Sequence, residues 1–308
     1  MLARPNKTLH AAGLILIYAL IIGFVDNFVR LIAVEAGLWQ FHLVRSVMAL
    51  VILAGVSAPL HLRLRPKNVQ AVLARSCIHA VAMMIYFGAL AFLPVALVAA
   101  GVLTAPIFVI LISAMMYGER IGVMAILAVM LGFGGAILVL GPQSMTTASP
   151  YILLPVLAGA LYAFSNIATT KWCAGESAET LMAAYILMLG VFGAIGLLIL
   201  WLMPFPLAGI AADFVLRGPV WPAFSFWQWT LLQAVGSLVG IGFLMRAYQI
   251  APATKVAVFE YMFLPVSALW GWLLWEQTFT LTATLGMGLI AAAGILIATN
   301  TVKPAVAN

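Results

Sequence analysis

Long apolar runs separated by short polar segments dominate this chain of 308 residues. Runs of about twenty residues have the length that an α-helix needs to cross a hydrocarbon layer of about 30 Å. They lack the strict alternation of apolar and polar residues that a membrane β-barrel requires. The sequence therefore predicts an all-α integral membrane protein with ten spanning helices, at 11–33, 39–59, 69–92, 95–116, 121–141, 150–172, 179–202, 226–248, 253–274 and 279–299.

Composition supports this interpretation, since 66% of the residues are hydrophobic and only 7% are charged. An ordinary soluble domain has about 45–50% apolar and about 25% charged residues, so a water-soluble globule is excluded. The net charge of +6 comes from basic residues at the ends of the runs, which indicates membrane orientation and no nucleic-acid partner. A cytoplasmic N-terminus places on the inner side Arg4, Lys7, Arg63, Arg65, Lys67, Arg120, Lys171 and Lys303.

The predicted location is therefore the inner (plasma) membrane, with both termini in the cytoplasm and Arg217 almost alone on the outer side. The first run is too long for a signal-peptide core, and we expect it to be retained as a helix. The connection 203–225 holds several prolines and is expected to lie at the outer interface, either as a passive segment or as a lid.

An internal repeat relates two segments of the chain. Residues 92–120, "FLPVALVAAGVLTAPIFVILISAMMYGER", recur loosely at 250–278 as "IAPATKVAVFEYMFLPVSALWGWLLWEQT". The landmarks keep offsets of 157 to 159 residues, matching Pro94 with Pro252, Pro106 with Pro265, and Glu119 with Glu276. The sequence thus predicts two related halves, residues 1–145 and 146–308.

Five helices in each half force the second half to enter the membrane from the opposite side. Inverted repeats are typical of alternating-access transporters, whose substrate sits near the midplane between the halves. Pro106 and Pro265 fall near the centres of their helices, where the proline ring removes a backbone hydrogen bond. These matched breaks indicate either a binding site or simple kinks.

At this point the chain resembles a known family. The five-plus-five arrangement, "LWQFHLVRS" at 38–46, "GER" at 118–120 and "WEQ" at 275–277 are similar to the drug/metabolite transporter superfamily, EamA type. The resemblance covers essentially the whole chain and implies a transporter; members export amino acids or other metabolites, and some import riboflavin or S-adenosylmethionine. The halves differ at their presumed cavity walls, because "FVDNFVRLI" at 24–32 carries an acid where "FSNIATTKW" at 164–172 does not.

Charged residues within the first two spans are candidate gating residues. A charge at a helix centre costs about 2.5–3.5 kcal/mol on insertion scales, so it needs a partner or a purpose. Asp26 and Arg30 are four residues apart, so they can form an ion pair on one helix face, and Arg30 is also near enough to the outer surface to extend into water. His42 and Arg45 lie near the same outer surface. Asp26 then either alternates between two arginines as a gate that a substrate carboxylate opens, or forms a permanent structural pair.

A second set of charges lies in the inner half. Arg75, Arg246 and Lys255 are either substrate-binding or gating residues or, being near the cytoplasmic surface, extend into water and mark orientation. His79 and Glu260 lie deeper in their helices. Glu260, Asp26 and the two intramembrane histidines are candidates for carrying a coupling proton. Alternatively, Glu260 is a lasting counter-ion to Lys255 or Arg246.

Amides and aromatic residues complete the predicted site. Asn27 and Asn166 occupy similar depths in the first and sixth helices, where an amide bonds either a ligand or another helix. Aromatic rings either stack on a planar substrate or pack in the core. The candidates are Tyr86, Tyr162, Tyr261 and Trp270.

Within the spans, bases outnumber acids, which favours a ligand with a carboxylate. We therefore predict a secondary active transporter of a small polar or amphipathic metabolite, amino-acid-like or carboxylate-bearing, that works in export. The alternatives are an importer of a vitamin or nucleoside-type metabolite and a non-transporting scaffold subunit. The expected partners are a small-molecule substrate, membrane lipid and a coupling proton. Four scattered histidines and Cys77 and Cys173 form no enzyme or metal pattern, so no catalysis, cofactor or metal is expected.

Overall fold

The computed structural model describes residues 7–89, 93, 95–141, 151, 153–205, 210–276, 278 and 280–299. Within this part the regular structure consists of helices, and ten spans are long and apolar enough to cross a membrane, which confirms the predicted fold class. The boundary between residues 145 and 146, and Arg4, Pro94 and Lys303, lie outside the described residues.

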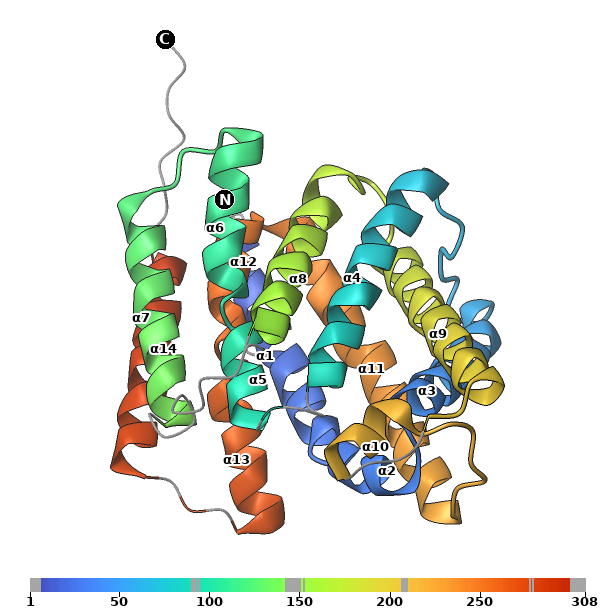
Figure 1. Ribbon diagram of the computed structural model, residues 1–308. Coiled ribbons are helices and arrows are strands. Elements are labelled where there is room, and N and C mark those ends of the chain that lie inside the picture. Colours follow the sequence, from blue (N-terminus) through green and yellow to red (C-terminus); the bar gives the residue numbers. More distant parts are fainter. Residues whose placement is uncertain are drawn as a thin grey trace.

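The described part of the chain contains fourteen helices, and thirteen of them, all except the short α10, make up these ten spans (Figure 1). Their bounds are α1 (Lys7–Asp26), α2 (Val29–Glu35), α3 (Leu38–Ser57), α4 (Val69–Ala89), α5 (Val95–Val102), α6 (Ala105–Tyr117), α7 (Val123–Leu140), α8 (Leu153–Lys171), α9 (Ala178–Leu202), α10 (Ile210–Leu216), α11 (Phe224–Ile250), α12 (Ala253–Glu260), α13 (Phe263–Trp275) and α14 (Leu281–Thr299).

Three spans are interrupted by short breaks in the helix. The fourth span divides into α5 and α6, and the ninth divides into α12 and α13. Pro106 is the second residue of α6 and Pro265 the third of α13, positions in a first turn where a missing N–H removes no intrahelical hydrogen bond. The prolines therefore lie at the start of new helical segments. The first span breaks between α1 and α2 without a proline, at Asn27 and Phe28.

The helices form one bundle in which segments from the two halves lie side by side. α7 packs against α14 at one edge, α3 packs against α9 at the other, and α1 packs against α11 as α8 packs against α4 (Figure 1). Numbered along the chain, these neighbours are spans 5 and 10, 2 and 7, 1 and 8, and 6 and 3. Exchanging each span with its counterpart five places away gives the same four pairs. α6 ends at the top of Figure 1 and α13 ends at the bottom.

Glycines let the backbones of α7 and α14 touch. A Cβ added to Gly286 would lie 2.5 Å from the carbonyl oxygen of Gly135, and one added to Gly135 would lie 2.7 Å from the carbonyl oxygen of Gly286. Small residues at such a seam permit the close van der Waals packing that holds helices together in lipid. Large apolar side chains such as Met115 and Leu153 are exposed on the outside of the bundle, as a hydrocarbon environment allows.

The segment around α10 is tied to the first half of the chain. The Trp39 indole donates to the carbonyl oxygen of Val215 at 2.9 Å, and the Arg217 guanidinium donates to that of Val34 at 2.8 Å. The Gln40 amide bonds both the backbone N–H and the carbonyl oxygen of Val220. The described part of the predicted interfacial connection is thus a strap over the ends of α2 and α3.

Candidate functional site

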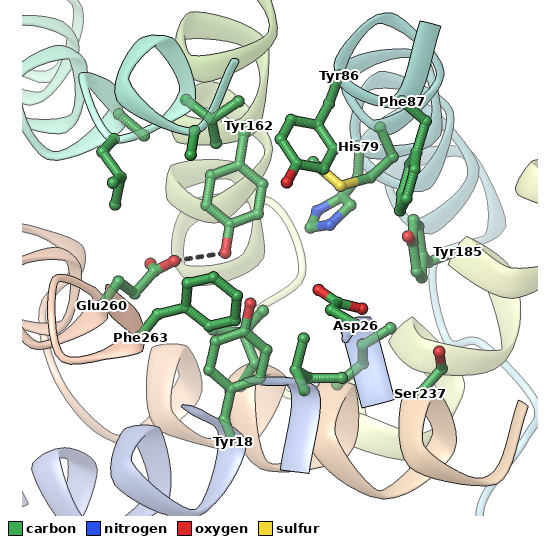
Figure 2. Close-up of a pocket in the computed structure, with 18 of the residues that line it drawn as sticks. Tyr18, Asp26, His79, Tyr86, Phe87, Tyr162, Tyr185, Ser237, Glu260 and Phe263 are labelled. Carbon is green, nitrogen blue, oxygen red and sulfur yellow. Dashed lines mark hydrogen bonds between the residues drawn. The ribbon is translucent and has the colours of Figure 1, made fainter. Parts of the chain in front are cut away.

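A cavity of about 140 Å³ lies in the middle of the bundle (Figure 2). Within the described residues its wall takes side chains from ten helices in both halves of the chain and none from α7 or α14. The ten are α1, α3, α4, α5, α6, α8, α9, α11, α12 and α13. Of the residues predicted from sequence, the wall includes Asp26, Arg45, His79, Tyr86, Pro106, Tyr162 and Glu260.

Glu260 is the last residue of α12, where the broken ninth span exposes its carboxylate to the cavity. The Tyr162 hydroxyl donates to Oε2 at 2.5 Å (Figure 2). The Tyr248 hydroxyl donates to Oε1. The two carboxylate oxygens therefore meet tyrosine hydroxyls. Arg246, one of the counter-ions considered from sequence, is exposed, and Lys255 is half-buried outside the cavity wall.

Asp26 is the last residue of α1 and also reaches the cavity. The Gln233 amide lies 3.3 Å from its Oδ1 and donates to the carbonyl oxygen of Val25 at 2.7 Å. The predicted ion pair between Asp26 and Arg30 is wrong. α1 ends between the two residues, so the four-residue spacing no longer places them on one face; Arg30 is exposed, and its guanidinium lies 3.5 Å from the ring centre of Trp275.

Arg45 is buried and faces the cavity from α3. Its Nη2 lies 3.1 Å from Nδ1 of His42, and its guanidinium lies 5.0 Å from the ring centre of Phe41. In the part of the chain that the structure describes, no carboxylate comes within 4.0 Å of this guanidinium. His42 is fully buried behind Arg45 and does not belong to the cavity wall.

Arg75 corrects a second expectation. The residue was expected to extend into water at the inner surface, but it is 0% exposed, because α8 and α11 cover this side of α4. Its Nε donates to the Thr169 hydroxyl at 2.8 Å, while Nη2 lies 3.2 Å from Nδ1 of His79 and 2.9 Å from the sulfur of Met245. Arg75 therefore lies directly behind His79, whose ring faces the cavity.

The two predicted amides lie outside the cavity wall. The Asn27 side chain donates to the carbonyl oxygen of Gly23 at 2.6 Å, within its own turn, at the break of the first span. Asn166 is fully buried in α8 beside Tyr248. Neither amide therefore reaches the cavity directly. Of the two, Asn166 lies next to Tyr248, which donates a hydrogen bond to Glu260.

Two predicted aromatic residues also point elsewhere. Tyr261 is buried against α7, where a Cβ on Gly132 would lie 2.3 Å from its ring. The Trp270 indole donates to the carbonyl oxygen of Leu20 at 2.9 Å on the outside of the bundle. Pro265 likewise lies outside the cavity wall.

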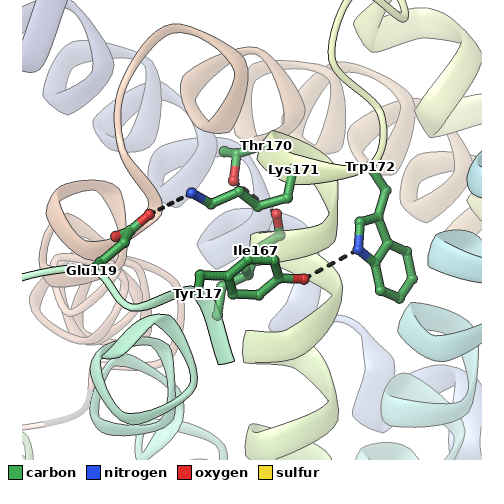
Figure 3. Close-up of polar contacts among 6 residues, drawn as sticks. All are labelled: Tyr117, Glu119, Ile167, Thr170, Lys171 and Trp172. Carbon is green, nitrogen blue, oxygen red and sulfur yellow. Dashed lines mark hydrogen bonds and ion pairs between the residues drawn. The ribbon is translucent and has the colours of Figure 1, made fainter. Parts of the chain in front are cut away.

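Two polar and aromatic contacts join the halves at opposite ends of the bundle. We call the first contact the clasp; it consists of Tyr117, Glu119, Lys171 and Trp172 (Figure 3). The Lys171 ammonium lies 2.6 Å from the Glu119 carboxylate and 5.2 Å from the Tyr117 ring centre. The Trp172 indole donates to the Tyr117 hydroxyl at 3.1 Å. At the other end, Arg30 lies over Trp275.

The two contacts have corresponding positions in the predicted repeat. Tyr117 and Trp275 end the fourth and ninth spans, 158 residues apart, and Lys171 and Arg30 lie near the ends of the sixth and first spans. Both contacts therefore combine a cation with an aromatic ring.

Comparison with known proteins now identifies the family. Residues 10–141 match the EamA-like transporter family. The chain is 30% identical, over 233 residues and 75% of each sequence, to the pseudopaline exporter CntI of Pseudomonas aeruginosa strain UCBPP-PA14. The chain belongs to the EamA-like transporter family. This EamA-like protein is also 26% identical to a riboflavin transporter of Brucella anthropi, over 72% of this chain and 74% of that one.

A solved crystal structure of a protein superposes on this EamA-like chain with a TM-score of 0.70. The alignment covers 96% of this chain and 98% of the other at 18% identity, and supports the fold alone. The predicted membership of the drug/metabolite transporter superfamily is confirmed, and the protein is a multi-pass membrane transporter.

Sequence reasoning missed several residues of the EamA-like cavity. The wall also contains Tyr18, Met83, Phe87, Tyr185, Ser237 and Phe263 (Figure 2). Tyr18 and Tyr185 stood out only as tyrosines inside otherwise apolar helices, a signal that gives depth but no face.

The charge of the EamA-like cavity differs from the predicted positive excess. Its wall carries two carboxylates, Asp26 and Glu260, and one guanidinium, that of Arg45. Arg30 and Arg246 are exposed, and Arg75 stands behind the wall. Charges of both signs therefore surround the cavity, among tyrosine and phenylalanine rings.

Proposed function

We propose that this EamA-like protein is a secondary carrier whose substrate occupies the central cavity. The observation that carries the proposal is a cavity inside the bundle, between helices of both halves, whose wall contains two carboxylates, one arginine and several tyrosines. Charged groups within a membrane bundle are expensive unless they serve a ligand or ion pathway. The substrate is a small amphipathic metabolite that bears a carboxylate, which meets Arg45, and a planar group, which stacks on the aromatic wall.

The proposed cycle is alternating access by two inverted halves, residues 1–145 and 146–308. Three observations support it: the set of neighbouring helices is unchanged by the five-span exchange, the fourth and ninth spans break at matched positions, and α6 and α13 end at opposite ends of the bundle. In such carriers the site lies at the repeat interface near the midplane. The proposed location is the inner membrane, with both termini in the cytoplasm.

Export is the proposed direction. Relatives with 30% identity include one named a pseudopaline exporter and one named a riboflavin transporter, so transport of a vitamin-like molecule is the second candidate. The aromatic wall suits either substrate. Arg45 favours the first, because a carboxylate is a strong bidentate acceptor for a guanidinium, and riboflavin has no carboxylate.

Reconstitution tests the proposed substrate class. Purified protein in liposomes is expected to give saturable counterflow for an aromatic amino acid, and the Arg45→Met variant, which keeps the apolar stem, should lower the rate about tenfold, because hydrogen bonds to charged groups contribute about 1.5–3 kcal/mol. Riboflavin serves as the carboxylate-free comparison. Saturable flux of riboflavin alone, unaffected by Arg45→Met, would favour the vitamin-transport candidate. No flux for any solute would favour a scaffold.

The clasp provides a test of alternating access. Lys171→Met removes the ion pair with Glu119, and solvent-exposed pairs contribute about 0.2–1 kcal/mol. The population in which this face is open should rise by up to about fivefold. Cys173, which is buried beside the clasp, then reacts faster with a maleimide in a Cys77→Ser background.

Arg120→Met is the matched control for the clasp variant, because Arg120 is an exposed base next to Glu119 with a similar change of charge. We expect Cys173 labelling in this control to equal that of the parent. Equal labelling in Lys171→Met and Arg120→Met would contradict a gating role for the clasp.

A further inference from the structure

Two histidine rings in the bundle are each bound by a buried arginine. Arg75 reaches Nδ1 of His79 with Nη2 at 3.2 Å, and Arg45 reaches Nδ1 of His42 with Nη2 at 3.1 Å. Both arginines and both histidines are buried. Only His79 lies in the wall of the cavity, so only its ring can meet a molecule held there.

The arginine determines which ring nitrogen of His79 carries the proton. A guanidinium has donors and no acceptor, so the ring nitrogen that it contacts must accept. An imidazole whose Nδ1 accepts is neutral and has its hydrogen on Nε2. The Ser165 hydroxyl lies 2.9 Å from the same Nδ1 and 2.8 Å from the carbonyl oxygen of Tyr162, and its single hydrogen can be directed to only one of them. When Nδ1 accepts from Arg75, that hydrogen is directed to Nδ1 instead of to the carbonyl oxygen. The hydrogen bonds of the ring within the described residues therefore all involve Nδ1.

Aromatic rings fix the orientation of His79. The ring centre of Tyr162 lies 5.1 Å away and that of Tyr185 4.5 Å away, both in edge-to-face arrangements. These contacts hold the ring plane while Arg75 and Ser165 occupy its inner edge. Nε2 is the remaining nitrogen, and the ring points into the space that Figure 2 shows between Asp26 and Glu260.

We propose that His79 presents a fixed, neutral Nε2–H donor to the cavity and selects substrates with an acceptor atom at that position, such as a carboxylate or carbonyl oxygen. Arg75 is the positioning residue, because it sets the tautomer without touching the substrate. The inference rests on the proposed function only in taking the cavity as the substrate site. From the sequence, both His79 and the carboxylates were candidates for carrying a coupling proton. In this proposal His79 only donates a hydrogen bond, and any coupling proton is carried by a carboxylate.

The titratable groups around His79 agree with this division. Its own helix contributes Arg75, α8 contributes Tyr162, and α9 contributes Tyr185. α11 places Tyr248 near Arg75, and α12 places Glu260 in the same cavity wall, bound by the hydroxyls of Tyr162 and Tyr248. In the described residues no carboxylate lies within 4.0 Å of the His79 ring.

Nitrogen NMR of protein labelled at histidine and embedded in lipid tests the tautomer without any ligand. His79→Gln identifies the His79 signals by their loss. The expected result is a neutral ring protonated at Nε2, unchanged between pH 5 and pH 8 in the parent and in Arg75→Lys, which keeps a donor-only cation. In Arg75→Met the ring should show both tautomers or titrate in this range. A charged ring or an Nδ1–H tautomer in the parent would overturn the proposal, as would identical spectra in Arg75→Met.

Binding tests the donor role. The Gln amide nitrogen reaches about where Nε2 lies, whereas the shorter Asn amide mimics Nδ1, so His79→Gln should keep and His79→Asn should lose affinity for L-phenylalanine or riboflavin by about tenfold. Affinity is measured by the ligand-induced rise in melting temperature. Equal loss in both variants would overturn the donor role. Failure of both probes to bind the parent would overturn the cavity as their site, and with it the proposed function, while the NMR result would still decide the tautomer.

Discussion

Glu260→Gln is expected to lower transport per inserted molecule about tenfold or more and to remove its dependence on pH. The carboxylate accepts hydrogen bonds from Tyr162 and Tyr248, and an amide has only one oxygen to offer two hydroxyl donors. One tyrosine hydroxyl must therefore reverse its role and accept from the amide N–H, or lose its partner, and in either case a hydrogen bond to a charged group, which contributes about 1.5–3 kcal/mol, is lost. The measurement is the initial rate of counterflow in liposomes between pH 5.5 and pH 8.5.

The expected pH dependence tests the hypothesis that Glu260, one of the candidates from the sequence, carries a coupling proton. A glutamine cannot exchange a proton, so a cycle that depends on this step loses its response to pH. Asp26→Asn tests the other carboxylate of the cavity and is expected to keep the response. Glu276→Gln is the matched control, because Glu276 is exposed at the end of α13. A pH response that survives in Glu260→Gln but disappears in Asp26→Asn would transfer the role to Asp26.

Gly286→Val is expected to reduce the stability of the protein by at least about 1–3 kcal/mol, the usual cost of overpacking a close contact. Its Cβ would meet the carbonyl oxygen of Gly135 at 2.5 Å, whereas non-bonded carbon contacts are favourable at about 3.5 Å or more. The obstacle is backbone, which cannot rotate away as a flexible side chain does. The two helices must therefore separate, and the measurement is the melting temperature in detergent.

Gly288→Ala and Gly134→Ala are the controls for this seam, since an added Cβ at either position meets nothing within 4 Å. Both are expected to melt at or above the parent temperature, because alanine favours a helix over glycine. Molecules of Gly286→Val that remain folded should transport at the parent rate, because α7 and α14 contribute nothing to the cavity wall. A normal melting temperature in Gly286→Val would show that the helices do not meet at this seam.

The sequence predicted the ten spans because the length of an apolar run is a direct response to bilayer thickness. It also predicted Arg45, Asp26 and Glu260 as site residues that line the cavity, since a charge within such a run has few other reasons to be there. The interruptions in the fourth and ninth spans carried a local signal in Pro106 and Pro265. The interruption after Asp26 had no proline, so the spacing to Arg30 gave the wrong partner.

Tertiary packing accounts for the other differences. The position of a residue in an apolar run predicts its depth in the membrane. Whether the side of the helix on which it lies faces lipid, another helix or the cavity depends on which helices pack there. Arg75 lies near the start of its helix, and only contacts with Thr169 and Met245 from other helices remove it from water. Tyr18 and Tyr185 reach the cavity for the same reason. Helix neighbours such as these are set by contacts across the two halves, which no local pattern records.

The strap around α10 has a consequence for inhibitor design. It belongs to the second half of the chain, yet Trp39, Gln40 and Val34 of the first half bond it directly. A folded epitope that joins both halves is a natural target for an antibody fragment, which would immobilise the carrier without competing for its central chamber. Blocking of this kind depends on shape at the surface, and therefore should not be overcome by raising the concentration of the transported solute.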